Sequence, residues 1–239
     1  MKIGILKCDT AMENVLKKYG DYDELFRKLL KLSDKEIEIV KFDCVKGELP
    51  IDRDYKKYDG FIISGSRYSC YEDIEWIHNL KSKIVEMDKL NIKMVGICFG
   101  HQLIMYALGG EVKPNKNGWE VSVSDIFTTD RGYDILCQNN KRRYSINQMH
   151  KDIVSKLPEN FEELFYNSNS RNQGCIKNNI LTFQGHPEYN PFVINEFLEN
   201  RRDIIGREIV ENGLQNINKK TDTDFFSRII YKFLNVSDV

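Results

Sequence analysis

A short apolar run turns into a helix at Val95-Gly96-Ile97-Cys98-Phe99-Gly100-His101-Gln102. The apolar residues from 92 to 97 predict a buried strand, and the spacing from 99 to 108 predicts a helix that ends at Gly109-Gly110. The cysteine at the junction has one glycine two residues before it and another two residues after it. A strand, a tight turn and a helix in this order predict a nucleophile elbow, with cysteine in place of serine.

The surroundings of Cys98 favour a reactive thiol, although a free cysteine taken alone is most often a buried packing residue. We expect Gly96 and Gly100 to remove side chains that would crowd the thiol. The N-terminus of the following helix favours the thiolate form. Its free N–H groups, including that of Phe99, suit the stabilisation of an oxyanion.

Further apolar runs extend this pattern toward the N-terminus. Strands are predicted at residues 2–7, 36–42 and 60–63, in addition to 92–97. Helical spacing is found between them at residues 23–32 and 74–87. Strands that alternate with helices predict an α/β fold, with a mostly parallel central sheet and helices on both faces.

The rest of the chain has a different pattern. Short strand-like runs at 120–127, 143–147 and 180–183 are broken by turn residues and predict a small antiparallel β region. Helical spacing returns from Pro191 to about Val210, and a last helix is predicted at 225–234. With no repeat or linker in the sequence, we predict one domain over 1–239, with a core at about 1–190 and C-terminal helices at about 191–239.

A second motif supplies a base at Thr182-Phe183-Gln184-Gly185-His186-Pro187-Glu188. A β-rich run carries His186 into a loop that Pro187 stiffens, and Glu188 follows two residues later. An imidazole near a thiol forms a thiolate–imidazolium pair, and a carboxylate on its other nitrogen fixes the tautomer. Taken alone, the motif also fits a surface turn.

The chain has three other histidines. His78 is predicted to be solvated on a charged helix. His101 lies one turn from Cys98 on the same helix, which limits its approach to the sulfur. His150 is harder to exclude on sequence alone.

Composition narrows the function. Hydrophobic residues make up 41% and charged residues 30% of 239, and the formal net charge is -1, so neither nucleic acid nor a membrane is an expected partner. The six cysteines form no CxxC and no Cys/His cluster, so no metal and no cofactor are predicted. The first residues read as a strand and not as a signal peptide, and reduced thiols predict a cytoplasmic protein.

Together, the motifs 96–102 and 185–188 resemble those of the class I (triad) glutamine amidotransferases, and the resemblance extends from the first strand to about residue 190. It implies a flavodoxin-like fold and a γ-glutamyl substrate. It also implies Cys98 as nucleophile, His186 as base and Glu188 as the third member of a triad.

The resemblance further implies a set of binding residues. Gly65 in the loop Ser64-Gly65-Ser66 provides an oxyanion N–H beside that of Phe99, and Ser66 belongs to the same substrate-binding loop. Gln102 helps to bind the glutamyl group. The segment from Gln148 to Asp152 matches a loop in which Met149, His150 and Lys151 hold the substrate's α-amino and α-carboxylate groups.

The oxyanion loop departs from the Gly-Gly-Pro or Pro-Gly-Pro of synthetase-linked members. This version, together with 118–123, resembles a stand-alone branch that includes γ-glutamyl peptidases.

Three hypotheses follow: a hydrolase that releases glutamate from a γ-glutamyl peptide or glutamine through a thioester, a glutaminase subunit that delivers ammonia to a separate synthetase, and a silent binding or regulatory module. Arg67, Tyr68 and Tyr71 either line a leaving-group pocket or are solvated loop residues. The sequence does not indicate an oligomeric state.

Overall fold

The computed structural model describes residues 1–33, 36–136 and 140–235. Its strands are β1 (Lys2–Lys7), β2 (Glu38–Asp43), β3 (Gly60–Ile63), β4 (Met94–Ile97), β5 (Glu111–Pro114), β6 (Glu120–Thr128), β7 (Arg143–His150), β8 (Asp152–Lys156), β9 (Glu162–Tyr166), β10 (Gly174–Lys177) and β11 (Ile180–Phe183). Its α-helices are α1 (Glu13–Tyr19), α2 (Tyr22–Leu30), α3 (Glu75–Lys89), α4 (Phe99–Ala107), α5 (Asp130–Leu136), α6 (Pro191–Asn200), α7 (Arg202–Ile205), α8 (Arg207–Asn216) and α9 (Thr223–Asn235).

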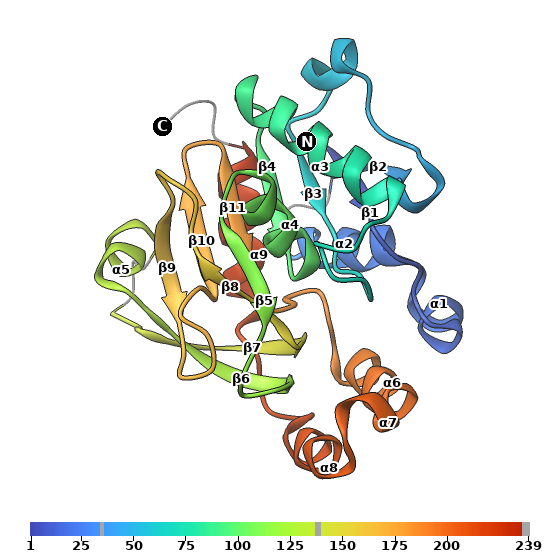
Figure 1. Cartoon of the computed structure of the whole chain (residues 1–239), viewed down its shortest axis with the longest axis vertical. Coiled ribbons are helices and arrows are strands. Elements are labelled where there is room, and N and C mark those ends of the chain that lie inside the picture. Colours follow the sequence, from blue (N-terminus) through green and yellow to red (C-terminus); the bar gives the residue numbers. More distant parts are fainter. Residues whose placement is uncertain (34–35, 137–139, 236–239) are drawn as a thin grey trace.

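Over the described residues, one nine-stranded sheet runs through the molecule in the order β2-β1-β3-β4-β11-β10-β9-β6-β7 (Figure 1). The strands from β2 to β11 in this order are parallel to one another. Their carboxyl ends therefore lie at one edge of the sheet, and the loops after β1, β3, β4 and β11 meet there. The predicted α/β fold is confirmed.

The remaining strands of the sheet, β10, β9, β6 and β7, are antiparallel to their neighbours. The predicted antiparallel region thus continues the main sheet, and a separate two-stranded sheet joins β5 to β8. Sequence periodicity missed β5, β8, β9 and β10. It also ended β7 at residue 147, whereas the strand runs on to His150 and the next strand begins at Asp152.

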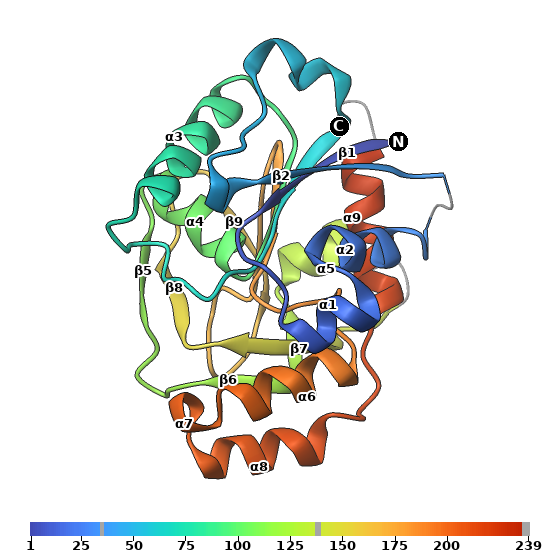
Figure 2. The same cartoon turned by 90° about the vertical axis from the view of Figure 1, so that its right-hand side faces the viewer.

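Helices cover both faces of the parallel strands, as predicted (Figure 2). On one face, α3 and α4 bury Ile84 and Leu103 against the sheet. On the other face, α2 and α9 bury Phe26 and Phe226. Helices α1, α6 and α8 form a further apolar cluster around Val193, beside the loop that follows β11.

The C-terminal region is more helical than the sequence indicated. The stretch predicted at 191–210 forms α6, α7 and α8, and α8 continues to Asn216. The short helix α1, which the apolar pattern did not reveal, packs against α6. In the part of the chain described, no helix combines the length and apolarity needed to cross a bilayer.

Candidate active site

Cys98 lies in a strained turn between β4 and α4. Its backbone has φ 52° and ψ -103°, a conformation that side-chain-bearing residues rarely adopt. The turn is held because the Cys98 N–H donates to the Phe183 carbonyl at 2.9 Å and the Cys98 carbonyl accepts from Gln102 N–H at 2.9 Å. The tight turn that the sequence predicts at this cysteine is therefore present.

The two flanking glycines allow close packing of the backbone. A Cβ on Gly100 would lie 2.2 Å from the Ile63 carbonyl oxygen, and one on Gly96 would lie 2.7 Å from the Gly100 carbonyl oxygen. The expectation that they chiefly clear space around the thiol is therefore incomplete. They let the first turn of α4 lie directly on β3 and β4, which fixes where the helix begins.

His186 and Glu188 lie beside Cys98 because β11 pairs with β4, with Phe183 opposite Ile97. The loop after β11 therefore emerges next to the turn after β4. The His186 Nδ1 is 2.7 Å from Glu188 Oε1, and both side chains are buried. The His186 backbone N–H donates to the Asn147 carbonyl at 2.7 Å, which ties this loop to β7.

The electrostatics of this group favour a charged imidazole. Burial disfavours the charge on His186, but the neighbouring Glu188 carboxylate and Cys98 sulfur outweigh it and raise the pKa of His186 to about 10. A protonated imidazole between a carboxylate and a sulfur is the arrangement expected of a thiolate–imidazolium pair.

An aromatic stack supports the imidazole from one side. The ring of Tyr189 lies 4.0 Å from that of His186 at 5°, and Phe197 stacks on Tyr189 at 5.3 Å. The Tyr189 hydroxyl donates to that of Tyr22 at 3.3 Å. Sequence reasoning missed Tyr189 and Tyr22. The only available signal was that Tyr189 directly follows Glu188.

The loop after β3 lies against the other edge of the imidazole. A Cβ on Gly65 would lie 2.8 Å from His186 Cε1, so only glycine fits there. The loop is anchored to its neighbours because Ser64 Oγ accepts from Cys8 N–H at 2.9 Å and the Ser64 carbonyl accepts from Gly100 N–H at 3.1 Å. Ser66, predicted to bind substrate, uses its hydroxyl to donate to the Cys8 carbonyl at 2.8 Å.

The predicted oxyanion donors belong to this loop and to the start of α4. Phe99 is the first residue of α4, where an N–H has no carbonyl of the helix to bond. Among the residues described, neither the Phe99 N–H nor the Gly65 N–H donates a hydrogen bond. Their role as oxyanion donors stays a prediction.

The segment predicted as a substrate-binding loop is instead the end of β7 and the start of β8, with only Lys151 between them. Strand pairing with β6 continues to His150 because that residue lies opposite Glu120. The Met149 carbonyl lies 3.9 Å from Cys98 Sγ. Gln102 Nε2 donates to the Asp152 carbonyl at 2.8 Å, so this glutamine holds the turn beside the nucleophile.

His150 is committed to a buried network and has no free nitrogen. Its Nε2 lies 3.1 Å from Glu120 Oε2 and its Nδ1 lies 3.1 Å from the Asp152 carbonyl. The Glu120 carboxylate also accepts hydrogen bonds from three amide side chains: Asn167, Asn169 and Gln173. Burial raises the pKa of Glu120, but His150 and the amides outweigh it and lower the pKa to about 2. This network braces the turn between β7 and β8, and the sequence did not reveal it.

The other histidines are accounted for. His101 is fully buried with Nδ1 2.9 Å from Thr182 Oγ1, and burial together with the charge of His150 lowers its pKa to about 3. A neutral imidazole that faces Thr182 is a packing group. His78 is half exposed on α3 and lies 2.7 Å from Asp73.

The described cysteines are free and buried: Cys8, Cys44, Cys70, Cys98 and Cys175. Cys137 lies outside the described residues. Burial raises the pKa of Cys70 to about 12 and raises that of Cys175 further. Neither of these two lies in the strained turn beside the imidazole.

Comparison with known proteins agrees with this geometry. The model of the family "Glutamine amidotransferase class-I" matches residues 15–202. A glutamine amidotransferase-like protein of Schizosaccharomyces pombe is 33% identical over 246 residues, which cover 97% of this chain and 98% of that protein. Gamma-glutamyl peptidase 4 of Arabidopsis thaliana is 34% identical over 227 residues, with 91% of this chain and 89% of that protein covered.

Two further similarities concern a synthase component and a solved structure. One component of the glutamine-hydrolyzing GMP synthase of Saccharolobus solfataricus is 33% identical over 171 residues, which cover 71% of this chain and 85% of that component. The crystal structure of a glutamine amidotransferase from Thermotoga maritima superposes with a TM-score of 0.79 over 99% of both chains, at 18% identity. At that identity the superposition shows a shared fold. Because the family match spans most of its length, the chain belongs to the class I glutamine amidotransferase family.

Proposed function

We propose that the protein hydrolyses γ-glutamyl amides through a thioester on Cys98, with His186 as base and Glu188 as its orienting partner. The single observation that carries this proposal is the buried line from the strained Cys98 turn through His186 to Glu188. Family membership supports the same chemistry.

The first half of the proposed reaction makes the thioester. The Cys98 thiolate attacks the γ-carbonyl carbon, and the oxygen takes up negative charge beside the N–H groups of Gly65 and Phe99. The carbon–nitrogen bond then breaks. The proton on His186 Nε2 moves to the leaving amine, while Glu188 continues to accept from Nδ1.

The second half restores the enzyme. A water molecule gives a proton to His186 Nε2 as its oxygen attacks the thioester carbonyl. Glutamate leaves when the carbon–sulfur bond breaks, and Cys98 returns as a thiolate beside the protonated imidazole. These steps use the protein's own side chains and water.

We further propose a γ-glutamyl peptide as substrate. Four relatives that cover 87% to 95% of this chain are named gamma-glutamyl peptidases. The alternative is a glutaminase that supplies ammonia to a separate synthetase, and the similarity to the GMP synthase component favours it. The two functions share the nucleophile and differ in the amine that leaves.

Glutamate release tests the proposal. The purified protein is incubated with glutamine and with γ-glutamyl peptides, alongside Cys98→Ser and the matched control Cys70→Ala, which changes a buried cysteine away from the turn. We expect release by wild type and by Cys70→Ala, and none by Cys98→Ser. Intact-mass measurement after treatment with a glutamine-like chloroketone should show one adduct that is absent from Cys98→Ser. Release that survives Cys98→Ser contradicts the proposed mechanism.

A further inference from the structure

If the proposed function holds, the position of His186 determines where the leaving group of the substrate lies. The amine that leaves must accept its proton from His186 Nε2, so it lies within hydrogen-bond reach of that nitrogen. On the proposed function, the glutamyl part lies on the other side of the scissile bond. Whatever is attached to the amine therefore extends along the imidazole edge, where His186 Cε1 faces Gly65.

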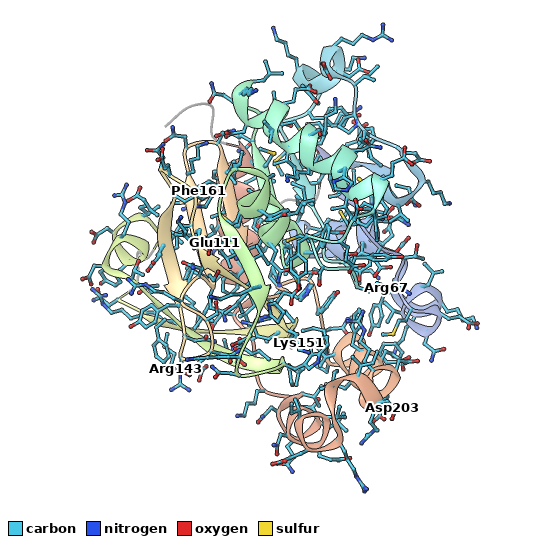
Figure 3. The ribbon with its side chains drawn as sticks, in the orientation of Figure 1. Arg67, Glu111, Arg143, Lys151, Phe161 and Asp203 are labelled. Carbon is cyan, nitrogen blue, oxygen red and sulfur yellow. The ribbon has the colours of Figure 1, made fainter. Side chains whose placement is uncertain are left out.

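Arg67 is the cation closest in sequence to this edge. It follows Gly65 by two residues, so the two Cα atoms are at most about 7 Å apart. The Arg67 backbone N–H donates to Asp9 Oδ2 at 2.9 Å, which ties this part of the loop to the segment just after β1. The Arg67 side chain is 56% exposed and lies on the α1 side of the site, whereas Lys151 lies on the side of β6 and β7 (Figure 3).

Asp9 holds the guanidinium by one edge only. Arg67 Nε donates to the Asp9 carboxylate at 3.0 Å, and Nη2 lies 2.8 Å from Asp9 Oδ1 and 3.4 Å from the Thr10 carbonyl. Within the described chain, Nη1 has no hydrogen-bond partner. Because Asp9 is buried just after β1, it fixes the direction of the Arg67 guanidinium. The Nη1 atom of that guanidinium is left open to a ligand.

We propose that Arg67 is a specificity-determining residue that binds the carboxylate of the leaving amino acid, and so selects γ-glutamyl amino acids over glutamine. A γ-glutamyl amino acid releases an amine whose carboxylate lies two bonds from the nitrogen, whereas glutamine releases ammonia. With Nε and Nη2 held by Asp9 and Thr10, Nη1 is left to donate a charge-assisted hydrogen bond to a carboxylate. The inference rests on the proposed function of Cys98 and His186.

The two aromatic residues of the same loop do not share this position. The Tyr68 ring packs edge-on against Trp76 in the apolar cluster under α3. Tyr71 follows Ser69 by two residues, and Ser69 Oγ donates to Asp152 Oδ2 at 2.6 Å, at the start of β8. Of the three residues that the sequence suggested for the leaving-group pocket, Arg67 is the one whose charged side chain is both exposed and held in a fixed direction by Asp9.

Three substrates and a matched pair of variants test the inference. kcat/KM is measured for γ-glutamyl-alanine, for its C-terminal amide and for glutamine, with wild type, Arg67→Met and Arg67→Lys. Arg142→Ala is the control, since Arg142 is also a half-exposed arginine paired with an aspartate, but next to the start of β7 and away from the site. Loss of one charged hydrogen-bonding group costs about tenfold or more in kcat/KM. We expect that loss for Arg67→Met with γ-glutamyl-alanine, a smaller loss for Arg67→Lys, and changes within about twofold for the amide and glutamine.

The variant should fold, because the Asp9 carboxylate keeps two backbone donors, Thr10 N–H at 2.7 Å and Arg67 N–H at 2.9 Å. Thermal unfolding verifies this for each variant. An equal loss on the acid and the amide, or no loss on the acid, overturns the role of Arg67 while leaving the proposed function intact. If wild type releases glutamate from none of the three substrates, the proposed function and this inference fail together.

Discussion

The ring of Tyr189 lies parallel to the imidazole of His186, with centroids 4.0 Å apart and planes 5° apart. The imidazole is thus held by its Nδ1 bond to Glu188 in its own plane and by a flat ring below that plane. On the proposed function, an imidazole held in two directions need not be reoriented at each turnover.

Tyr189→Leu should lower kcat about tenfold with a smaller change in KM, because the imidazole loses its supporting ring but keeps its carboxylate. Tyr189→Phe is the matched control, since it keeps the stack and removes only the 3.3 Å bond to Tyr22. Steady-state kinetics on a γ-glutamyl substrate separate the two variants. Equal losses in both would assign the effect to the hydroxyl pair instead of the stack.

Glu188→Gln should lower the pKa of His186 and lower kcat by at least about tenfold, because the carboxylate stabilises the imidazolium. The folded pKa of about 10 exceeds the unfolded value of about 6.5, so this group stabilises the fold fully below pH 6.5 and loses that contribution as the pH rises through 10. Urea unfolding at pH 6 and pH 10 measures the free energy of unfolding at each pH. Between the two pH values, this free energy should fall more for wild type than for Glu188→Gln. An identical fall in the free energy of unfolding for both proteins would show that the Glu188 carboxylate does not stabilise the charged His186 imidazole.

The Glu120 carboxylate should contribute to stability in the opposite pH range. Its folded pKa of about 2 lies below the ordinary value of 4.5, so the contribution is present above pH 4.5 and is lost as the pH falls through 2. The shift corresponds to about 3 kcal/mol at neutral pH. Glu120→Ala should unfold at lower urea concentration at pH 7, and the difference from wild type should shrink toward pH 2. A pH-independent difference would point to lost packing.

Gly100→Ala should prevent folding or destabilise the protein by several kcal/mol, because its Cβ would lie 2.2 Å from a carbonyl oxygen of β3. Gly118→Ala is the control: its backbone has φ +81°, but nothing lies within 4 Å of an added Cβ. We expect a cost of about 1 kcal/mol there. Circular dichroism on heating compares the two, and similar melting temperatures would contradict the packing argument.

The parallel half of the fold could be predicted because most of its strands, such as β3, β4 and β11, are buried on both faces. Runs such as 60–63 and 94–97 hold no polar side chain, and the helix between them has a regular apolar stripe. The strands β9 and β10 were missed since they are short, mix charged with apolar residues and gain their stability from pairing with distant segments. Local periodicity carries little information about such pairing.

The residues of the candidate site also divide into those that the sequence could predict and those that it could not. Cys98, His186 and Glu188 could be located because each lies in a short motif with its own chemistry. The network of Glu120 with His150 could not, since its members come from separate strands and loops and meet only when β6 and β7 pair. For the same reason Arg67 could be named but not oriented, because its direction is set by Asp9, 58 residues away in the sequence.

The contact between Gly65 and His186 has a consequence for redesign. The first residues of the loop after β3 are constrained, because they touch the base and the helix start. From residue 67 onward the loop is mixed: Arg67, Tyr71 and Asp73 are exposed and free to change, whereas Tyr68 packs on Trp76 and Cys70 is buried. On the proposed function, exchange of the exposed positions Arg67, Tyr71 and Asp73 would therefore alter selectivity and leave the turn at Cys98 unchanged. On the same proposal, one loop holds both residues that affect turnover and residues that affect substrate choice.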